Sequence, residues 1–285
     1  MTITFDTMTG KFKEITGTKD MRKENGFCVN VGKNGAKYVV ADTVTNSWLH
    51  IVDGNSKVGE SVINFNFPIE YTCKHDCECY KNKACYACHG CYTFSDNQAA
   101  YTENYNFYKS VPKPLFVAAL QSAINKFNLP LMRYFTIGDI PDAAFLDCMV
   151  IIAKHNPCMR FWSYTKKYSI VNNYIRKHGE LPENLVIIFS HWLNDNGTYY
   201  PMENPYNLPT SDFIPFGKEQ LAEKVTHICP CSDPTVKATC ATCEKPCYKL
   251  AHGESMALLE HSTKRTKERD KALRLAHEKL EKAGK

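Results

Sequence analysis

Two dense groups of cysteines are the residues of this chain best suited to chemistry. The first group lies in residues 72–91, TCKHDCECYKNKACYACHGC, where six cysteines fall within nineteen residues. The second lies in residues 227–248, HICPCSDPTVKATCATCEKPCY. Thiols at this density form disulfides, bind zinc or bind iron–sulfur clusters. In a reducing compartment, clustered thiols in a chain of 285 residues indicate metal binding rather than disulfides.

The N-terminal sequence and the composition predict a cytoplasmic protein. The first residues, MTITFDTMTGKFKE, lack the apolar core of a signal peptide, and no run of eighteen apolar residues is present. Hydrophobic residues make up 44% of the chain and charged residues 23%, which is typical of a folded globular protein. We therefore expect reduced thiols and no membrane partner.

The candidate metal ligands form two sets. The first set is Cys73, Cys77, Cys79, Cys85, Cys88 and Cys91. The second set is Cys229, Cys240, Cys243 and Cys247, with Cys231 beside it. The second set has the spacing C-x10-C-x2-C-x3-C, which is close to that of ferredoxin-type iron–sulfur sites. Zinc ribbons normally pair two C-x2-C motifs, and only one is present here, so structural zinc is the alternative.

The first set allows two arrangements. Its last three cysteines, in CYACHGC, are spaced by three residues and can contribute to a ferredoxin-like site. Alternatively, Cys73, Cys85 and one of Cys77 or Cys79 can hold a cluster with one iron open. The total number of thiols exceeds the need of one metal centre, so the sequence favours at least two clusters.

The rest of the chain alternates between apolar strands and amphipathic helices. We expect strands within residues 61–73, 129–139, 159–165 and 184–193, and helices within 112–127, 141–156 and 168–179. Pro141 lies near a predicted helix start, and Gly179 suits a helix C-terminal cap. Near-continuous apolar strands between such helices are typical of a parallel sheet covered by helices. The predicted fold class is α/β, with a partial (βα) barrel.

Four segments follow from this pattern. We expect a β-rich cap in residues 1–60, the partial barrel in 61–226 with the cysteine loop 73–91, the C-terminal cysteine cluster in 227–250, and a charged helix or tail in 251–285. Residues 264–285 carry nine Lys or Arg against four Asp or Glu. A solvated helix face is the first interpretation of this tail, and a nucleic-acid partner is the alternative.

The unusual motifs follow predicted strands, where the functional loops of barrels lie. They are the cysteine loop, TIGDIPD, SYTKKY and SHWLND. Arg133 and Lys166, at or near strand ends, can face a carboxylate or phosphate in the barrel mouth, and a surface position is the alternative. The Gly138–Asp139 pair marks a turn after its strand that leads into a helix cap.

Several of these segments together resemble the phage-encoded gene product 88 family. They are TC…CYAC and NQAAYTENY near the first cysteines, RYFTIGDIPDAAFLD, MRFWSYTKKY, and the closing cysteines of residues 229–248. The family is similar to radical S-adenosylmethionine proteins, in which three cysteines bind a [4Fe–4S] cluster whose open iron takes S-adenosylmethionine. The resemblance implies that Gly138 and Asp139 contact the methionyl end of that cofactor, and that the protein works in the cytoplasm of an infected or lysogenic bacterial host with a cellular or phage reductant.

The cysteine loop departs from the usual radical S-adenosylmethionine motif, C-x3-C-x2-C. Cys73 and Cys77 have the first spacing, but Cys79 comes one residue too early, and Cys85 follows six residues later. If all four bind iron, no iron stays open for a cofactor. The alternative functions are therefore electron transfer by closed clusters and a zinc-stabilised protein that binds nucleic acid.

Overall fold

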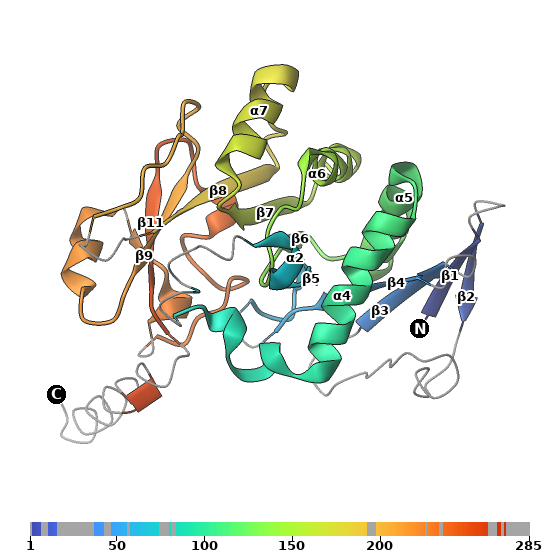
Figure 1. Cartoon of the computed structure of the whole chain (residues 1–285), viewed down its shortest axis with the longest axis horizontal. Coiled ribbons are helices and arrows are strands. Elements are labelled where there is room, and N and C mark those ends of the chain that lie inside the picture. The colour runs from blue at the N-terminus through green and yellow to red at the C-terminus, as the bar shows by residue number, and fades with distance from the viewer. Residues whose placement is uncertain are drawn as a thin grey trace.

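A computed structural model describes residues 2–6, 11–15, 37–42, 47–55, 58–73, 80, 84–192, 198–225, 227–233, 236–261, 267–268 and 271. In these residues eleven strands form one sheet, in the order β10-β11-β9-β8-β7-β6-β5-β4-β3-β1-β2 (Figure 1). The chain therefore has a mixed α/β fold.

The elements have the following bounds. The strands are β1 (Thr2–Asp6), β2 (Lys11–Ile15), β3 (Lys37–Asp42), β4 (Ser47–Asp53), β5 (Val62–Phe65), β6 (Leu131–Tyr134), β7 (Arg160–Thr165), β8 (Leu185–His191), β9 (Thr210–Ile214), β10 (His227–Ile228) and β11 (Ser255–Leu259). The α-helices are α2 (Ile69–Thr72), α4 (Ser95–Ser110), α5 (Lys113–Phe127), α6 (Ala143–His155) and α7 (Tyr168–His178). Short 3-10 helices are η1 (Tyr86–Cys88), η2 (Gly90–Thr93), η3 (Glu219–Lys224), η4 (Pro230–Ser232) and η5 (Cys247–Lys249).

The middle of the sheet is parallel, as its apolar strands predicted. Strands β5, β6, β7, β8 and β9 pair in sequence order, and all four pairings are parallel. The carboxyl ends of these strands therefore meet at one edge of the sheet. The four strands described within residues 1–60 extend the same sheet, because β4 pairs antiparallel with β5.

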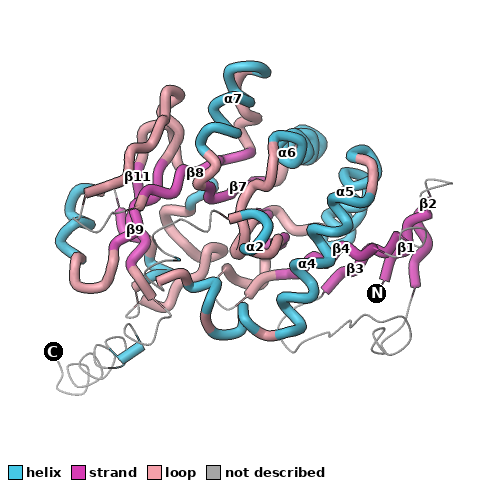
Figure 2. The backbone as a smooth tube through the Cα atoms, in the orientation of Figure 1, coloured by secondary structure: helices cyan, strands magenta, loops and turns pink. Residues whose placement is uncertain are grey.

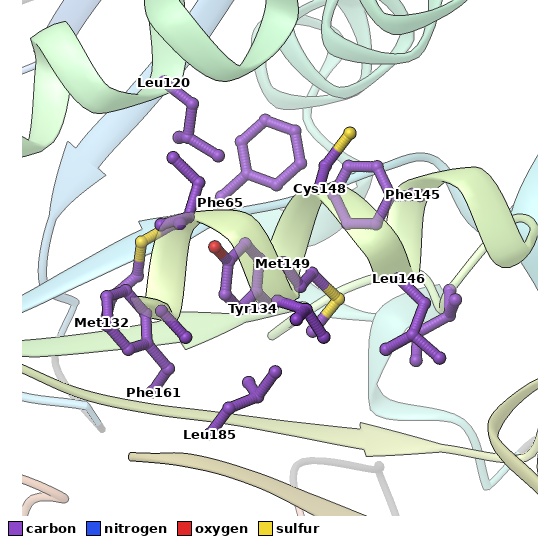
Figure 3. Close-up of a cluster of buried hydrophobic side chains, with 14 of the residues drawn as sticks. Phe65, Leu120, Met132, Tyr134, Phe145, Leu146, Cys148, Met149, Phe161 and Leu185 are labelled. Carbon is purple, nitrogen blue, oxygen red and sulfur yellow. The ribbon is translucent and has the colours of Figure 1, made fainter. Parts of the chain in front are cut away.

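The helices α4 to α7 cover one face of this sheet. Alternate strand residues point to it, such as Met132 and Tyr134 on β6, and they pack against Phe145 and Met149 of α6 (Figure 3). Helix α6 lies between α5 and α7 (Figure 2); α5 contacts β3 and β4, and α6 contacts β8. The main hydrophobic core lies between these helices and the sheet.

Local signals explain where the helices begin and end. Helix α6 begins after Asp142, whose carboxylate accepts a hydrogen bond from the Phe145 N–H at 3.0 Å. Pro141 therefore precedes the cap instead of opening the helix. Helix α7 ends at Gly179, which has φ of +81°, so the predicted C-terminal cap is confirmed.

The described part of residues 227–250, which we call the cysteine-rich segment, covers the opposite face of the sheet. We call this face the inner face. Trp162 of β7 and Ile188 of β8 pack there against Cys229, Cys247 and Leu250. The 3-10 helix η5 contacts both of these strands. The inner face is thus buried by loops that carry thiols, whereas the other face is buried by helices.

One prediction about the C-terminal region was wrong. Residues 255–259, which we assigned to a charged helix or tail, form strand β11 and pair with β9. Met256 and Ala257 are buried there, and this burial outweighs the charged character of the residues that follow. Most of residues 262–285 lie outside the described residues, so the charged tail stays a prediction. The division of the chain into four segments is likewise a prediction.

None of the helices in the described part of the chain is both long and apolar enough to cross a membrane.

Candidate functional site

A cavity lies on the inner face, at the carboxyl ends of the parallel strands. The cavity has a volume of about 200 Å³. Its walls come from the loops after β5, β6 and β7, from β8 and β9, and from the cysteine-rich segment. This is the position at which parallel α/β sheets bind ligands.

Thiols from both cysteine groups line this cavity. They are Cys73 and Cys85 of the first group, and Cys229, Cys231, Cys240 and Cys247 of the second. The two groups are more than 130 residues apart in the sequence, and the sheet brings them to one space. None of the cysteines in the described residues forms a disulfide.

The other predicted ligands are placed differently. Cys88, Cys91 and Cys243 do not line the cavity, and Cys91 is exposed. Cys77 and Cys79 lie outside the described residues. Within the described part of the chain, no group of three or more His, Cys, Asp or Glu side chains is arranged to hold a metal ion. The ligand assignments therefore remain predictions.

Three thiols of the second group are in direct contact. The Cys231 thiol hydrogen-bonds with Cys229 and with Cys240, and this raises its own pKa. The same contact lowers the pKa of Cys229 and lowers that of Cys240 to about 6, with the positive charge of Arg133 adding to the effect on Cys240. This part of the cavity therefore stabilises thiolates, the form that binds metals.

Cys247 lies deeper, against the strands. Burial raises the pKa of its thiol to about 12. The Tyr164 hydroxyl donates a hydrogen bond to its sulfur at 2.8 Å, and the sulfur of Met256 lies 3.4 Å away. These contacts fix Cys247 to strands β7 and β11.

Arg133 lies beside the second group of thiols and near Tyr86, the residue that follows Cys85. Its guanidinium hydrogen-bonds with Cys240 and lies 5.1 Å from the ring centroid of Tyr164. Burial acts to lower the pKa of Arg133, but Tyr86, Cys240 and other neighbours outweigh it and raise the pKa, so the side chain stays positive. Its Nε has no hydrogen-bond partner among the described residues. The predicted role near an anionic group fits this position.

Gly138 lines the cavity at a point where only glycine fits. Its φ is +90°, and a Cβ added there would lie 2.5 Å from the carbonyl oxygen of Phe67 and 3.0 Å from Oγ1 of Thr72. The backbone after β6 therefore packs directly on the chain between β5 and α2.

Asp139 lines the same wall and is held by donors of its own chain. Its carboxylate accepts hydrogen bonds from the Thr165 hydroxyl at 2.5 Å, the Lys166 N–H at 3.0 Å and the Ile140 N–H at 2.7 Å. Burial raises its pKa, although these donors act to lower it. Asp139 thus joins the ends of β6 and β7 and fixes the backbone of Lys166.

Lys166 is the fourth predicted cofactor residue, and it also lines the cavity. Its ammonium group lies 4.3 Å from the ring centroid of Trp192, a cation–π contact. Trp192 in turn stacks on Phe213 with a centroid separation of 4.2 Å. All four predicted cofactor residues therefore surround one space.

Comparison with known protein families identifies one match. The model of a family described as gene product 88 matches residues 39–204, which is more than half of the chain. The chain belongs to the gene product 88 family. No curated protein and no solved structure matches it.

The gene product 88 match covers part of the site. It includes the first cysteine group and the four predicted cofactor residues, and it ends before the second cysteine group. The similarity to radical S-adenosylmethionine proteins thus stays an inference from sequence motifs.

Sequence reasoning missed some lining residues of this gene product 88 protein. Cys231 was placed beside the second ligand set, although its thiol joins two other members of the cluster. Ser211 and Trp192 were not predicted as site residues, yet both line the cavity. Ser211 lies on β9 and Trp192 directly follows β8, so the alternation of strand residues between the two faces is the signal that could have found them.

Proposed function

We propose that this gene product 88 protein is an iron–sulfur protein with at least two clusters facing one cavity, and that it acts as a radical S-adenosylmethionine-like enzyme. The observation that carries the proposal is the convergence of six thiols from two distant segments on that cavity. Soft thiolates are the preferred ligands of iron–sulfur clusters.

The thiols would divide between two centres. Cys73 and Cys85 would supply two ligands of the first, and Cys77 and Cys79 are the further candidates for it. Cys229, Cys231, Cys240 and Cys247 would hold the second. Arg133 would offset the negative charge that thiolates bring to the region between them.

The arrangement of the sheet supports a partial barrel. Strands β5 to β9 are parallel and consecutive, helices α4 to α7 cover one face, and the cavity lies on the other face at the carboxyl ends. Barrel enzymes place their helices outside and their sites at the carboxyl ends of the strands.

The four cofactor residues would hold S-adenosylmethionine beside the first centre. A reduced cluster with an open iron supplies the electron for reductive cleavage of that cofactor. Gly138 lets the backbone approach closely, Asp139 fixes the loop ends, and the cations Arg133 and Lys166 suit a carboxylate. The substrate of the enzyme stays open.

Anaerobic purification followed by iron, sulfide and zinc analysis and by EPR tests the proposal. Two [4Fe–4S] clusters predict a brown protein with roughly eight irons and eight sulfides per chain. Reduction should give the EPR signals of two interacting centres. A colourless protein that contains zinc alone would overturn the proposal.

The enzymatic part needs a separate assay. The reduced protein is incubated with S-adenosylmethionine, and 5′-deoxyadenosine is measured by chromatography. Formation of the product supports radical chemistry. Absence of the product at full cluster occupancy would instead identify the closed clusters of an electron-transfer protein.

Structural zinc in the second centre is the other candidate. The Cys231 thiol contacts both Cys229 and Cys240, and clustered thiolates are the ligands of structural zinc sites. In that case the analysis would find one zinc ion per chain and iron at the first centre only. Nucleic-acid binding by the tail stays a prediction that a salt-sensitive mobility shift would test.

A further inference from the structure

We propose that the end of this cavity at β7, β8 and β9 is a binding subsite for a carboxylate or phosphate group, held by Lys166 and Ser211. The inference rests on the proposed function, because both take the cavity to be a ligand site. It assigns the class of chemical group that the ligand carries.

The first support is an unpartnered buried hydroxyl. Ser211 is 1% exposed and lines the cavity, and its Oγ has no hydrogen-bond partner among the described residues. The indole Nε1 of Trp192, another lining residue, is buried and unpartnered in the same way. Buried polar groups are nearly always hydrogen-bonded, so two such donors at one end of a cavity indicate a missing acceptor.

The second support is the strand register. Thr165 pairs with Phe189, and Ser190 pairs with Ser211, so Lys166, Ser190 and Ser211 follow one another across β7, β8 and the start of β9. All three residues line the cavity. Lys166 and Ser211 are separated by two strand spacings, about 10 Å in all, so a group between them can contact both the long Lys166 side chain and the Ser211 hydroxyl.

The third support is the charge of the lining. Arg133 and Lys166 contribute two positive charges, and Asp139 is the one Asp or Glu among the described lining residues. Its carboxylate already accepts three hydrogen bonds, including the one from the Lys166 N–H. An anion entering this end therefore meets the Lys166 ammonium and the unpaired donors of Ser211 and Trp192.

The aromatic wall next to the subsite suggests what the anion is attached to. Trp192 and Phe213 stack at 4.2 Å, with an interplanar angle of 24°, and both line the cavity. Lys166 lies over the Trp192 ring. A ligand with a planar ring beside its anionic group would contact both features.

Calorimetric titration of the purified protein tests the subsite. The probes are inorganic phosphate, acetate, adenosine, adenosine 5′-monophosphate and S-adenosylmethionine. Phosphate and acetate separate the two anion classes, and adenosine against its monophosphate separates the ring from the anion. S-adenosylmethionine binding in the presence of saturating phosphate shows whether the cofactor's own carboxylate occupies the subsite.

Two variants and a matched control locate the binding. Lys166→Met and Ser211→Ala should each weaken binding of the anionic probes at least about 10-fold, because each removes a contact to a charged group. Lys167→Met removes the same charge from the next residue, which does not line the cavity, and should leave binding unchanged. Circular dichroism confirms that each variant is folded.

Two results would overturn the subsite. One is that no anionic probe binds at millimolar concentration, and the other is that both folded variants bind like the wild type. Metal content is measured in the same samples. Anion binding by an iron-free protein would contradict the proposed function and keep the subsite. An iron-loaded protein that binds no anion would keep the proposed function and overturn the subsite.

Discussion

The hydroxyl of Tyr164 donates a hydrogen bond to the sulfur of Cys247 across 2.8 Å, and this contact joins strand β7 to the cysteine-rich segment. Cys247 also lies 3.4 Å from the sulfur of Met256 on β11. The segment is therefore positioned by the inner face of the sheet itself, so the sheet and the second cysteine group should depend on each other for stability.

Replacing Tyr164 tests this dependence. Tyr164→Phe keeps the ring and removes the hydrogen bond, so it should lower the free energy of unfolding by about 1 kcal/mol. Urea denaturation followed by circular dichroism measures the change. Tyr71→Phe, at a side chain that is 57% exposed, is the control and should be neutral. Equal stability of the two variants would show that the Tyr164 contact contributes nothing.

Gly138 offers a test of the backbone next to the site. Gly138→Ala combines a positive φ with a Cβ placed 2.5 Å from the Phe67 carbonyl oxygen, so we expect a loss of about 3 kcal/mol. Gly179→Ala is the matched control, since its φ of +81° is similar but nothing lies within 4 Å of the added Cβ. It should cost about 1 kcal/mol. The idea of close packing fails if both variants lose the same stability in urea.

A buried amide links helix α4 to the sheet. The Asn104 side chain donates hydrogen bonds to the carbonyl oxygens of His50 and Asn66, each at 2.9 Å, and accepts one from the His50 N–H. Asn104→Ala would leave these buried backbone groups unpaired, at a cost of about 3 kcal/mol. Thermal unfolding should show the loss. Asn97→Ala, at a more exposed position of the same helix, should change stability much less, and a similar loss in both would contradict the role of Asn104.

The periodic part of the fold could be predicted from the sequence because its signals are local. Each helix carries its own signal, such as the apolar stripes of residues 112–127 and 168–179 and the cap at Gly179 directly after α7. Strand β11 could not be predicted in this way. Its only local signal is the short apolar run after Glu254, and its place beside β9 depends on the packing of distant segments.

The site residues likewise include some that the sequence predicted and some that it did not. The ends of the predicted strands identified Arg133 and Lys166, and the family resemblance identified Gly138 and Asp139. All four residues line the cavity, because parallel strands bring their carboxyl ends together. Spacing selected three of the four cavity-lining thiols of the second group, Cys229, Cys240 and Cys247, but not Cys231. It also favoured Cys243, the end of the C-x2-C motif, which does not line the cavity. The path of the loop instead brings Cys231 into the cluster.

Burial should protect one cysteine from chemical modification. Cys148 is completely buried on α6, and burial raises the pKa of its thiol to about 11, so at pH 8 roughly one molecule in a thousand is the reactive thiolate. Iodoacetamide should label Cys148 only after unfolding. The exposed Cys158 should be labelled in the native protein, which mass spectrometry of tryptic peptides can show. Labelling of both at equal rates would contradict the buried position.

The choice between Cys231 and Cys243 gives the sharpest test of the second metal centre. The Cys231 thiol contacts those of Cys229 and Cys240 inside the cavity, whereas Cys243 does not line it. Serine is a poor ligand for soft metal centres, so Cys231→Ser should remove the second centre, or roughly four of eight irons in an anaerobic preparation. Cys243→Ser changes the same atom in the same loop and should keep the full metal content.

Zinc content and the EPR signal of the first centre, measured on the same two variants, complete the comparison. Loss of zinc instead of iron from Cys231→Ser would identify the second centre as a zinc site while keeping its ligands. The reverse pattern, with metal lost from Cys243→Ser and retained by Cys231→Ser, would show that the loop rearranges when metal binds and that the C-x2-C spacing identifies the ligands. Because both variants carry the same substitution, a general destabilisation of the loop should affect them alike, so only a difference between them bears on ligation.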